Sequence, residues 1–131
     1  MRLLCCGSRT YRDRDWIWKI LDIENRYPIE IATGGAPGAD ALVAQVAKDL
    51  GITVTVFPAD WKRYGRKAGP IRNAEMLREF VPDRVFAFNH GTKLTPGTRD
   101  MVERAEKAGV IVYIFREVGR WRRNSEHVLG S

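Results

Sequence analysis

The stretch Ile29-Glu30-Ile31-Ala32-Thr33-Gly34-Gly35-Ala36-Pro37-Gly38-Ala39-Asp40 decides the fold. Residues 29–33 predict a strand, and the glycine-rich turn after it predicts an abrupt change of chain direction. Beyond the turn, apolar residues recur at helical spacing until Gly51, where the helix is expected to end; they are Leu42, Val43, Val46, Ala47 and Leu50. The stretch therefore predicts a strand, a turn and a helix in succession.

The same order of elements continues on both sides of this stretch. Short apolar runs predict four more strands, at residues 3–6, 52–57, 85–88 and 110–115. Helical spacing predicts three more helices, one through Trp16, Ile17, Ile20 and Leu21, one through Ile71, Ala74, Leu77 and Phe80, and one through Met101, Val102, Ala105 and Ala108. Strands that are apolar throughout and alternate with helices are typical of a parallel sheet covered on both faces. We predict an α/β fold, a three-layer α/β/α sandwich with a mainly parallel five-stranded sheet.

The ends of these helices carry their own signals. Asp13 or Asp15 is placed to cap the first helix, and Pro70 suits the first position of the helix that contains Ile71. The basic segment before it, residues 59–69, is expected to be irregular.

Length and composition are those of one domain. The chain has 131 residues, of which 44% are hydrophobic, enough for a core of its own. We expect a domain over residues 1–115 and a basic tail over residues 116–131. The apolar runs fall far short of the roughly 20 residues of a membrane span, and the N-terminus lacks the cleavage site of a signal peptide. A cytoplasmic location and no membrane partner are therefore expected.

Charge and cysteine content narrow the classes of ligand. Lys and Arg exceed Asp and Glu by 22 to 16, a net charge of +6, which suits phosphate-bearing ligands from a nucleotide to a nucleic acid. Cys5 and Cys6 are adjacent, and neighbours on a strand point to opposite faces, so we expect two reduced, buried thiols. With two histidines and no Cys-x-x-Cys pair, neither a metal site nor a cofactor is expected.

Polar segments follow the predicted strands. In open parallel sheets, ligands bind beyond the carboxyl ends of the strands, where helix N-termini face the crevice. Residues 7–10, 33–40, 60–73 and 89–98 all fall at that edge. They are therefore the segments from which a binding site is expected to be built.

The turn from Thr33 to Asp40 carries the sharpest signal. Its glycines let backbone N–H groups approach an anion, and the helix dipole adds attraction, although such a turn also reverses a chain without any ligand. Neither the P-loop pattern Gly-x-x-x-x-Gly-Lys-[Ser/Thr] nor the dinucleotide pattern Gly-x-Gly-x-x-Gly after the first strand is present. Asp40 would repel a phosphate, and it is expected to cap the helix or to accept from a ribose hydroxyl.

Cationic and aromatic side chains supply further candidates. Trp61-Lys62-Arg63-Tyr64-Gly65-Arg66-Lys67 combines four cations with two aromatic rings, which suits phosphate binding and base stacking, or else a solvated loop with Trp61 in the core. Arg72 and Asn73 lie on the polar side of the next helix, where Arg72 suits a bidentate phosphate contact or a surface salt bridge. Gly97 and Thr98 begin the last helix, with Thr98 expected as its cap and as an anion ligand.

Five motifs together resemble a known family. They are Cys6-Gly7-Ser8-Arg9, Thr33 through Asp40, Pro58-Ala59-Asp60-Trp61, Gly69-Pro70-Ile71-Arg72-Asn73-Ala74-Glu75-Met76 and Gly97-Thr98-Arg99-Asp100-Met101. In order and spacing they are similar to the YspA-like branch of the SLOG superfamily of Rossmann-like nucleotide-ligand domains. That superfamily includes the Lonely Guy phosphoribohydrolases and the DNA-processing protein A group. The resemblance covers about residues 3–115 and implies a Rossmann-like fold.

The chain departs from the Lonely Guy enzymes at the catalytic position. Those enzymes cleave the N-glycosidic bond of nucleoside monophosphates with the motifs Arg-Lys-x-x-Met and Pro-Gly-Gly-x-Gly-Thr-x-x-Glu. Arg72 matches the motif arginine, Asn73 replaces the lysine, and Gly97 and Thr98 match the Gly-Thr pair. Met101 stands where the catalytic glutamate is found, and Asp100 is adjacent but about 100° away around a helix.

The resemblance therefore favours binding over turnover. It implies a nucleotide or nucleotide-derived ligand, containing phosphate and ribose and ADP-ribose-like, held in a sensor or sequestering role. Amides of residues 34–39 and of Thr98, with Arg9 and Arg72, would hold phosphate; Asp40 or Asp60 would take ribose hydroxyls, and Trp61 would stack on the base. The full expected set is Gly7, Ser8, Arg9, Gly34, Gly35, Gly38, Ala39, Asp40, Asp60, Trp61, Arg72, Asn73, Gly97 and Thr98.

Two other functions remain open at this point. A nucleoside monophosphate N-glycosidase, or phosphoribohydrolase, would use Asp100 in the acid role together with Arg72. Single-stranded nucleic-acid binding would use residues 61–67 and the tail, with its Arg116, Arg120, Trp121, Arg122 and Arg123. A homodimer is also expected, since relatives often pair through helices.

Overall fold

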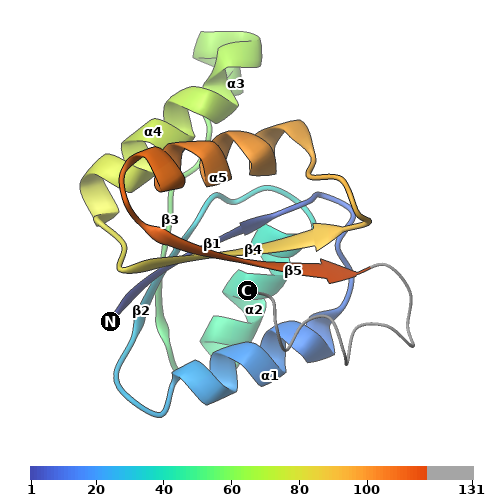
Figure 1. Ribbon diagram of the computed structural model, residues 1–131, viewed down its shortest axis with the longest axis vertical. Helices are drawn as coiled ribbons and strands as arrows, with labels where there is room; N and C mark the ends of the chain where they lie inside the picture. The colour runs from blue at the N-terminus through green and yellow to red at the C-terminus, as the bar shows by residue number, and fades with distance from the viewer. Residues whose placement is uncertain (118–131) are drawn as a thin grey trace.

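The computed structural model describes residues 1–117, which form five strands in one sheet (Figure 1). The strands are β1 (Arg2–Gly7), β2 (Glu30–Thr33), β3 (Thr53–Val56), β4 (Arg84–His90) and β5 (Ile111–Glu117). They lie in the order β3-β2-β1-β4-β5, and every neighbouring pair is parallel. The predicted five-stranded parallel sheet is confirmed, and its order, which the sequence left open, places β1 at the centre.

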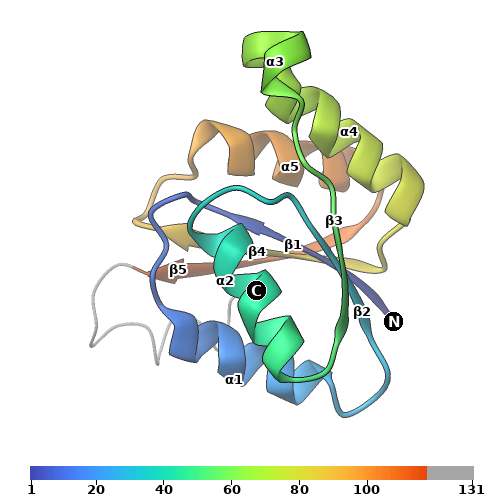
Figure 2. The same cartoon turned by 180° about the vertical axis from the view of Figure 1, so that it is seen from behind.

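Helices cover both faces of the sheet (Figures 1 and 2). Helices α1 (Arg14–Glu24) and α2 (Ala39–Asp49) lie on one face, and α4 (Ala68–Phe80) and α5 (Pro96–Lys107) lie on the other. The short helix α3 (Trp61–Tyr64) and the 3₁₀ turn η1 (Gly65–Lys67) connect β3 to α4 and project from one end of the molecule. This arrangement is the expected three-layer α/β/α sandwich. No helix within residues 1–117 combines the length and the apolar character needed to cross a bilayer.

The alternating side chains of β1 belong to two separate hydrophobic cores. Leu3 and Cys5 contact the core under α1 and α2, whereas Leu4 and Cys6 contact the core under α4 and α5. Both cysteines are free and buried, and burial raises the pKa of each thiol well above its ordinary value. The thiols therefore stay protonated, and the prediction of two reduced, buried cysteines is confirmed.

Helix α4 and the segment before it differ from the prediction. Residues 61–67 are helical rather than irregular, and α4 begins at Ala68, so Pro70 is its third residue instead of its first. A proline is tolerated there because the first four N–H groups of a helix have no acceptor within it. The buried face of α4 also differs from the predicted one. Asn73 is buried, and Ile71, predicted to face the core, is 38% exposed.

Among the other ends of helices and strands, the structure confirms some predictions and corrects others. Asp13 caps α1, because its carboxylate accepts a 3.1 Å hydrogen bond from the Trp16 N–H. Thr95, not Thr98, is the N-cap of α5, and Gly38, not Asp40, is the N-cap of α2. Strand β5 continues to Glu117, two residues beyond the expected end of the domain at 115. The predicted roles of Arg120, Trp121, Arg122 and Arg123 lie outside the described residues.

Candidate functional site

A pocket of about 450 Å³ opens at the carboxyl edge of the sheet, at the end of β1. The strand order reverses between β1 and β4, which is the position where open α/β sheets bind ligands, and the volume is typical of a small-molecule site. All four polar segments contribute to it. The lining residues are Cys6, Gly7, Arg9 and Thr10 from the end of β1; Gly34, Ala36 and Asp40 after β2; Trp61, Arg66, Gly69, Pro70, Arg72, Asn73 and Met76 after β3; and Thr95, Pro96, Gly97, Thr98 and Asp100 after β4.

Two glycines let the turns after β1 and β2 approach each other beneath the pocket. A Cβ at Gly7 would overlap the carbonyl oxygen of Phe88 and the Cβ of Ala39. Gly38 has a φ of 79°, and a Cβ there would overlap the backbone of Arg9. These two positions require glycine for the fold itself, whatever the pocket binds.

Asp40 holds the glycine-rich turn in shape. Its carboxylate accepts hydrogen bonds from the Thr33 hydroxyl (3.0 Å) and the Ala36 N–H (3.1 Å), so it ties the end of β2 to the turn. Burial raises the pKa of this carboxyl, whereas the two hydrogen bonds and the charges of Arg72 and Arg9 act to lower it. The Ala36 amide is thus occupied within the protein, and the Ala39 N–H donates to the Ser8 carbonyl oxygen at 3.1 Å. The run of amides at 34–39 is therefore not open to a phosphate as a whole, contrary to the prediction.

Arg72 is fixed between the turn and β3. Its Nη1 donates to the carbonyl oxygens of Gly34 (2.6 Å) and Phe57 (3.2 Å), and its Nε donates to Asn73 Oδ1 (3.0 Å). A Cβ at Gly34 would collide with this guanidinium, so glycine at that position makes room for it. Arg72 therefore positions the turn as well as lining the pocket.

Asn73 joins α4 to α5 along one wall of the pocket. Its Nδ2 donates to Asp100 Oδ2 (3.0 Å) and to the Gly97 carbonyl oxygen (3.3 Å). Asp100 Oδ2 also accepts a 2.8 Å hydrogen bond from Arg104 Nε. Met101 is fully buried in the core under α5, so Asp100 rather than Met101 lines the pocket.

The start of α5 meets the pocket through Pro96, Gly97 and Thr98. The first N–H groups of a helix have no acceptor within it and carry partial positive charge, which favours an anion. The Thr95 hydroxyl donates to Thr98 Oγ1 at 3.0 Å. The fully buried Asn89 fixes the preceding loop, because its Nδ2 donates to three carbonyl oxygens, those of His90, Gly91 and Lys93.

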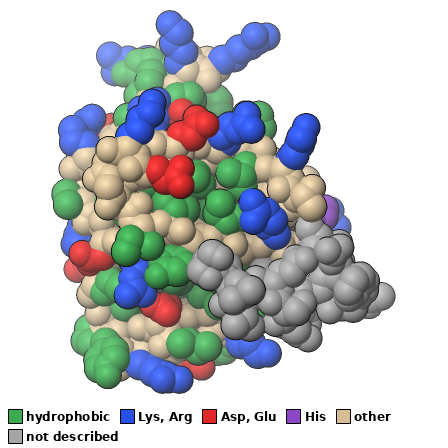
Figure 3. All heavy atoms as spheres, viewed as in Figure 1, with side chains coloured by type: hydrophobic (Ala, Val, Ile, Leu, Met, Phe, Trp, Pro, Cys, Tyr) green, Lys and Arg blue, Asp and Glu red, His purple; other side chains and the backbone are tan. Residues whose placement is uncertain are grey.

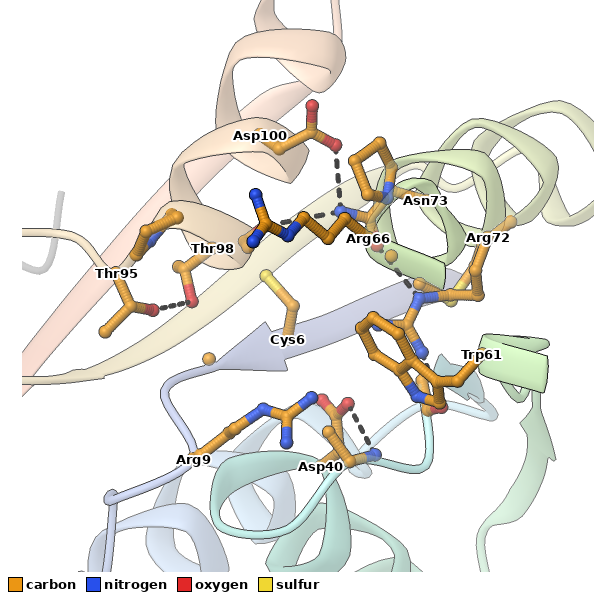
Figure 4. Close-up of a pocket in the computed structure, with 18 of the residues that line it drawn as sticks. Cys6, Arg9, Asp40, Trp61, Arg66, Arg72, Asn73, Thr95, Thr98 and Asp100 are labelled. Atoms are coloured by element: carbon orange, nitrogen blue, oxygen red, sulfur yellow. Dashed lines mark hydrogen bonds between the residues drawn. The ribbon is translucent and has the colours of Figure 1, made fainter. Parts of the chain in front are cut away.

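Arg9, Trp61 and Arg66 bring two cationic side chains and an aromatic ring to the lining of the pocket (Figure 4). The Arg9 guanidinium carbon lies 5.5 Å from the centre of the Trp61 ring, within the range of a cation–π contact. Trp61 is 49% exposed, so it lies at the pocket and not in the core. Figure 3 shows Lys and Arg side chains gathered at the end of the molecule formed by α3 and η1; they are Lys62, Arg63, Arg66 and Lys67.

Comparison with known proteins agrees with the resemblance of the motifs. The sequence profile of the YspA, cpYpsA-related SLOG family matches residues 1–64. The Gene 61 protein of Mycobacterium phage D29 is 36% identical over 122 residues, an alignment that covers 87% of this chain and 95% of that protein. The chain belongs to this SLOG family.

Two solved structures share the fold of this SLOG-family chain. DNA processing protein A (DprA) from Streptococcus pneumoniae superposes with a TM-score of 0.52 at 14% identity, over 85% of this chain and 57% of that chain. A UDP-N-acetylglucosamine 2-epimerase superposes with a TM-score of 0.53 at 14% identity, over 99% of this chain and 38% of that chain. This chain therefore spans only part of either structure, and at such low identity the likeness shows the α/β fold alone.

The predicted site residues of the SLOG-family chain fall into two groups. Those that line the pocket are Gly7, Arg9, Gly34, Asp40, Trp61, Arg72, Asn73, Gly97, Thr98 and Asp100. Those that lie outside it are Ser8, Gly35, Gly38, Ala39 and Asp60. The Ser8 hydroxyl instead accepts from the His90 N–H (2.8 Å), and the Asp60 carboxylate accepts from the Arg63 N–H (3.1 Å) as the cap of α3. Both side chains support the loops around the pocket.

Nine further residues line the pocket without belonging to the expected set, although Arg66 and Ala36 lie in segments proposed to bind phosphate. They are Cys6, Thr10, Ala36, Arg66, Gly69, Pro70, Met76, Thr95 and Pro96. Most of them lie in the four segments expected at this edge, so their position after a predicted strand is the signal that finds them. Met76 lies inside α4, and only the packing of the folded chain shows that it lines the pocket. Within residues 1–117, no group of three or more His, Cys, Asp or Glu side chains is arranged to hold a metal ion.

Proposed function

We propose that this pocket binds a nucleotide or nucleotide-derived ligand that carries phosphate, and that the protein senses or sequesters that ligand. The observation that carries the proposal is the convergence of the glycine-rich turn and the start of α5 on one cavity, which Arg9 and Arg66 also line. Membership of the SLOG family, whose domains are associated with nucleotide-related ligands, supports the same class.

Phosphate would sit at the start of α5. A Cβ at Gly97 would stand in open space among the described residues, so a phosphate oxygen can approach the backbone there closely. The nearby carboxylate of Asp100 is paired with Arg104 at 2.8 Å, which limits its repulsion of an anion. Arg66 adds a positive charge on the same side of the pocket.

The base would stack on Trp61. The ring is half-exposed, lines the pocket and already holds a planar cation, the Arg9 guanidinium. Stacking of a base on an aromatic side chain contributes roughly 1–3 kcal/mol. Ribose hydroxyls would meet Thr10 and Thr95, which line the pocket; each threonine hydroxyl keeps hydrogen-bonding capacity beside its contact with His90 (3.1 Å) or Thr98 (3.0 Å). Asp40 instead supports the glycine-rich turn, and Asp60 caps α3 and lies outside the pocket.

Hydrolysis of an N-glycosidic bond is the second candidate function, favoured by the presence of Asp100 in the pocket wall. Asn73 and Arg104 both donate to its Oδ2, so this oxygen is held in the wall. Met101, at the position of the glutamate in the Lonely Guy motif, is buried and uncharged. Binding without turnover therefore ranks first.

Calorimetric titration with AMP, ADP and ADP-ribose tests the proposal. Trp61→Ala is the site variant, and Tyr64→Ala is its matched control, since Tyr64 belongs to the same helix but lies outside the pocket. Wild type is expected to bind one or more of these ligands, Trp61→Ala to lose roughly 5- to 150-fold in affinity, and Tyr64→Ala to keep it. A folded protein that binds none of them contradicts the proposal.

Chromatographic detection of free base separates the two candidates. Release of base from nucleoside monophosphates that disappears in Asp100→Asn would establish hydrolysis. Binding with no release from purine or pyrimidine monophosphates supports the sensing or sequestering role.

A further inference from the structure

Most charged side chains that line the pocket have partners within the protein. Asp100 pairs with Arg104 at 2.8 Å. Arg72 donates to two carbonyl oxygens and to Asn73, and Asp40 accepts from Thr33 and Ala36. Within residues 1–117, by contrast, neither Arg9 nor Arg66 forms an ion pair. The carboxyl of Asp40 is near enough to Arg9 for their charges to interact, but neither arginine is held in an ion pair in the described part of the chain.

These two arginines come from different parts of the fold. Arg9 follows β1, and Arg66 belongs to η1. In Figure 4 their guanidinium groups lie on opposite sides of Cys6, with Arg9 toward Asp40 and Arg66 toward Thr98. The Trp61 ring, 5.5 Å from the Arg9 guanidinium carbon, provides a contact for Arg9 at the pocket.

We propose that Arg9 and Arg66 mark two separate anion subsites, so that the pocket takes a nucleotide with two phosphate groups rather than one. This inference rests on the proposed function, because it concerns the ligand of the same pocket. The Arg66 subsite includes the start of α5 with Gly97 and Thr98, and the Arg9 subsite lies beside the turn that follows β1.

A single phosphate would contact only one of the two arginines. A phosphate between Arg66 and the start of α5 leaves Arg9 on the far side of Cys6. Guanidinium groups bind phosphate best in direct, bidentate contact, and in Figure 4 a phosphate at the start of α5 would lie on the other side of Cys6 from Arg9.

Two phosphate groups can be attached to the same adenosine in two ways. They are linked as a diphosphate in ADP, and they are separated on the ribose in adenosine 3′,5′-bisphosphate. AMP is the reference with one phosphate. Because all three ligands carry the same base and ribose, the contribution of Trp61 is common to them.

The test is calorimetric titration of the full chain and of Arg9→Gln, Arg66→Gln and the double variant with these three ligands. Arg12→Gln and Arg63→Gln are matched controls, because each removes one exposed positive charge from the same segment as its counterpart and lies outside the pocket. All four single variants change the net charge equally. A difference between a site variant and its control therefore reports a contact and not the general field of the protein.

We expect one of the two-phosphate ligands to bind roughly tenfold or more tightly than AMP, and the tighter of the two identifies the arrangement. Each site variant should lower the affinity for that ligand about tenfold or more, while only one of them weakens AMP. The loss in the double variant should equal the product of the single losses, as for independent sites. The controls should change affinity by less than about threefold.

Failure of this inference differs from failure of the proposed function. If AMP binds as tightly as both two-phosphate ligands, or if both site variants weaken AMP, the two subsites do not exist although nucleotide binding stands. If neither these three ligands nor ADP-ribose binds a protein that still unfolds cooperatively on heating, the proposed function and the inference both fall.

Discussion

The Asn73 side chain donates a 3.0 Å hydrogen bond to the Asp100 carboxylate, across the contact between α4 and α5. The same nitrogen reaches the carbonyl oxygen of Gly97, and Asn73 Oδ1 accepts from Arg72. One buried amide thus links the arginine that supports the glycine-rich turn to the start of α5. The corresponding position of the Lonely Guy motif is lysine; in this chain Asn73 donates to Asp100 and adds no charge.

Removal of that amide should loosen the pocket wall. In Asn73→Ala, Asp100, Gly97 and Arg72 each lose a hydrogen-bond partner in a partly buried place, which should lower the free energy of unfolding by about 2 kcal/mol. Denaturant titration measures this change. Arg78→Ala, on the exposed side of the same helix, is the control and should stay within about 0.5 kcal/mol of wild type. Equal stability of the two variants would show that the amide does not join the helices.

Gly7 should tolerate no side chain at all. A Cβ there overlaps the Phe88 carbonyl oxygen and Ala39 Cβ, so Gly7→Ala should destabilise the protein by about 1–3 kcal/mol or more. Gly97→Ala is the matched comparison, because its Cβ enters open space among the described residues, and alanine is favoured over glycine in a helix. Thermal unfolding should show a lower melting temperature for Gly7→Ala only. A similar melting temperature for both variants would contradict the close approach of β1 to β4 and α2.

Asp40 should make stability depend on pH in a defined direction. Folding raises the pKa of this carboxyl above its ordinary value of 3.8, so the folded protein binds the proton more tightly than the unfolded chain. Its contribution to stability is therefore fully present below the unfolded pKa and is lost as pH rises through the folded pKa. The stability of wild type relative to Asp40→Asn, measured with denaturant across pH, should fall from acid toward neutral pH and then level off. A relative stability that rises over that range contradicts the raised pKa.

The fold could be predicted from the sequence because the patterns that indicate strands and helices are local. The runs at residues 3–6 and 85–88 have only to be apolar and short to indicate strands, and their alternation with helices indicates a parallel sheet. The strand order has no such signal, since it depends on which side of β1 each crossover passes. The position of the pocket then follows from the order, at the reversal between β1 and β4.

The sequence predicted the directions of individual side chains less well than it predicted the fold. The hydrophobic pattern of α4 assigned Ile71 to the core and Asn73 to the polar side, yet Asn73 is buried because it finds partners on α5. Ser8 and Asp60 lie in the right segments, but their oxygens accept hydrogen bonds from nearby backbone N–H groups. Arg66 faces the pocket because residues 65–67 form a 3₁₀ turn where an irregular loop was expected. Such details depend on contacts between elements, which a single sequence does not display.

A negative charge at the start of α5 tests most directly whether that helix end holds an anion. Gly97→Asp places a carboxylate where the Cβ has open space and where the helix dipole favours it, so the fold should keep a melting temperature within a few degrees of wild type. Gly97→Asn is its control, with nearly the same size and no charge. We predict that Gly97→Asn retains the nucleotide affinity of wild type within a fewfold, and that Gly97→Asp loses roughly tenfold or more. Equal nucleotide affinity in the two variants would contradict anion binding at this helix.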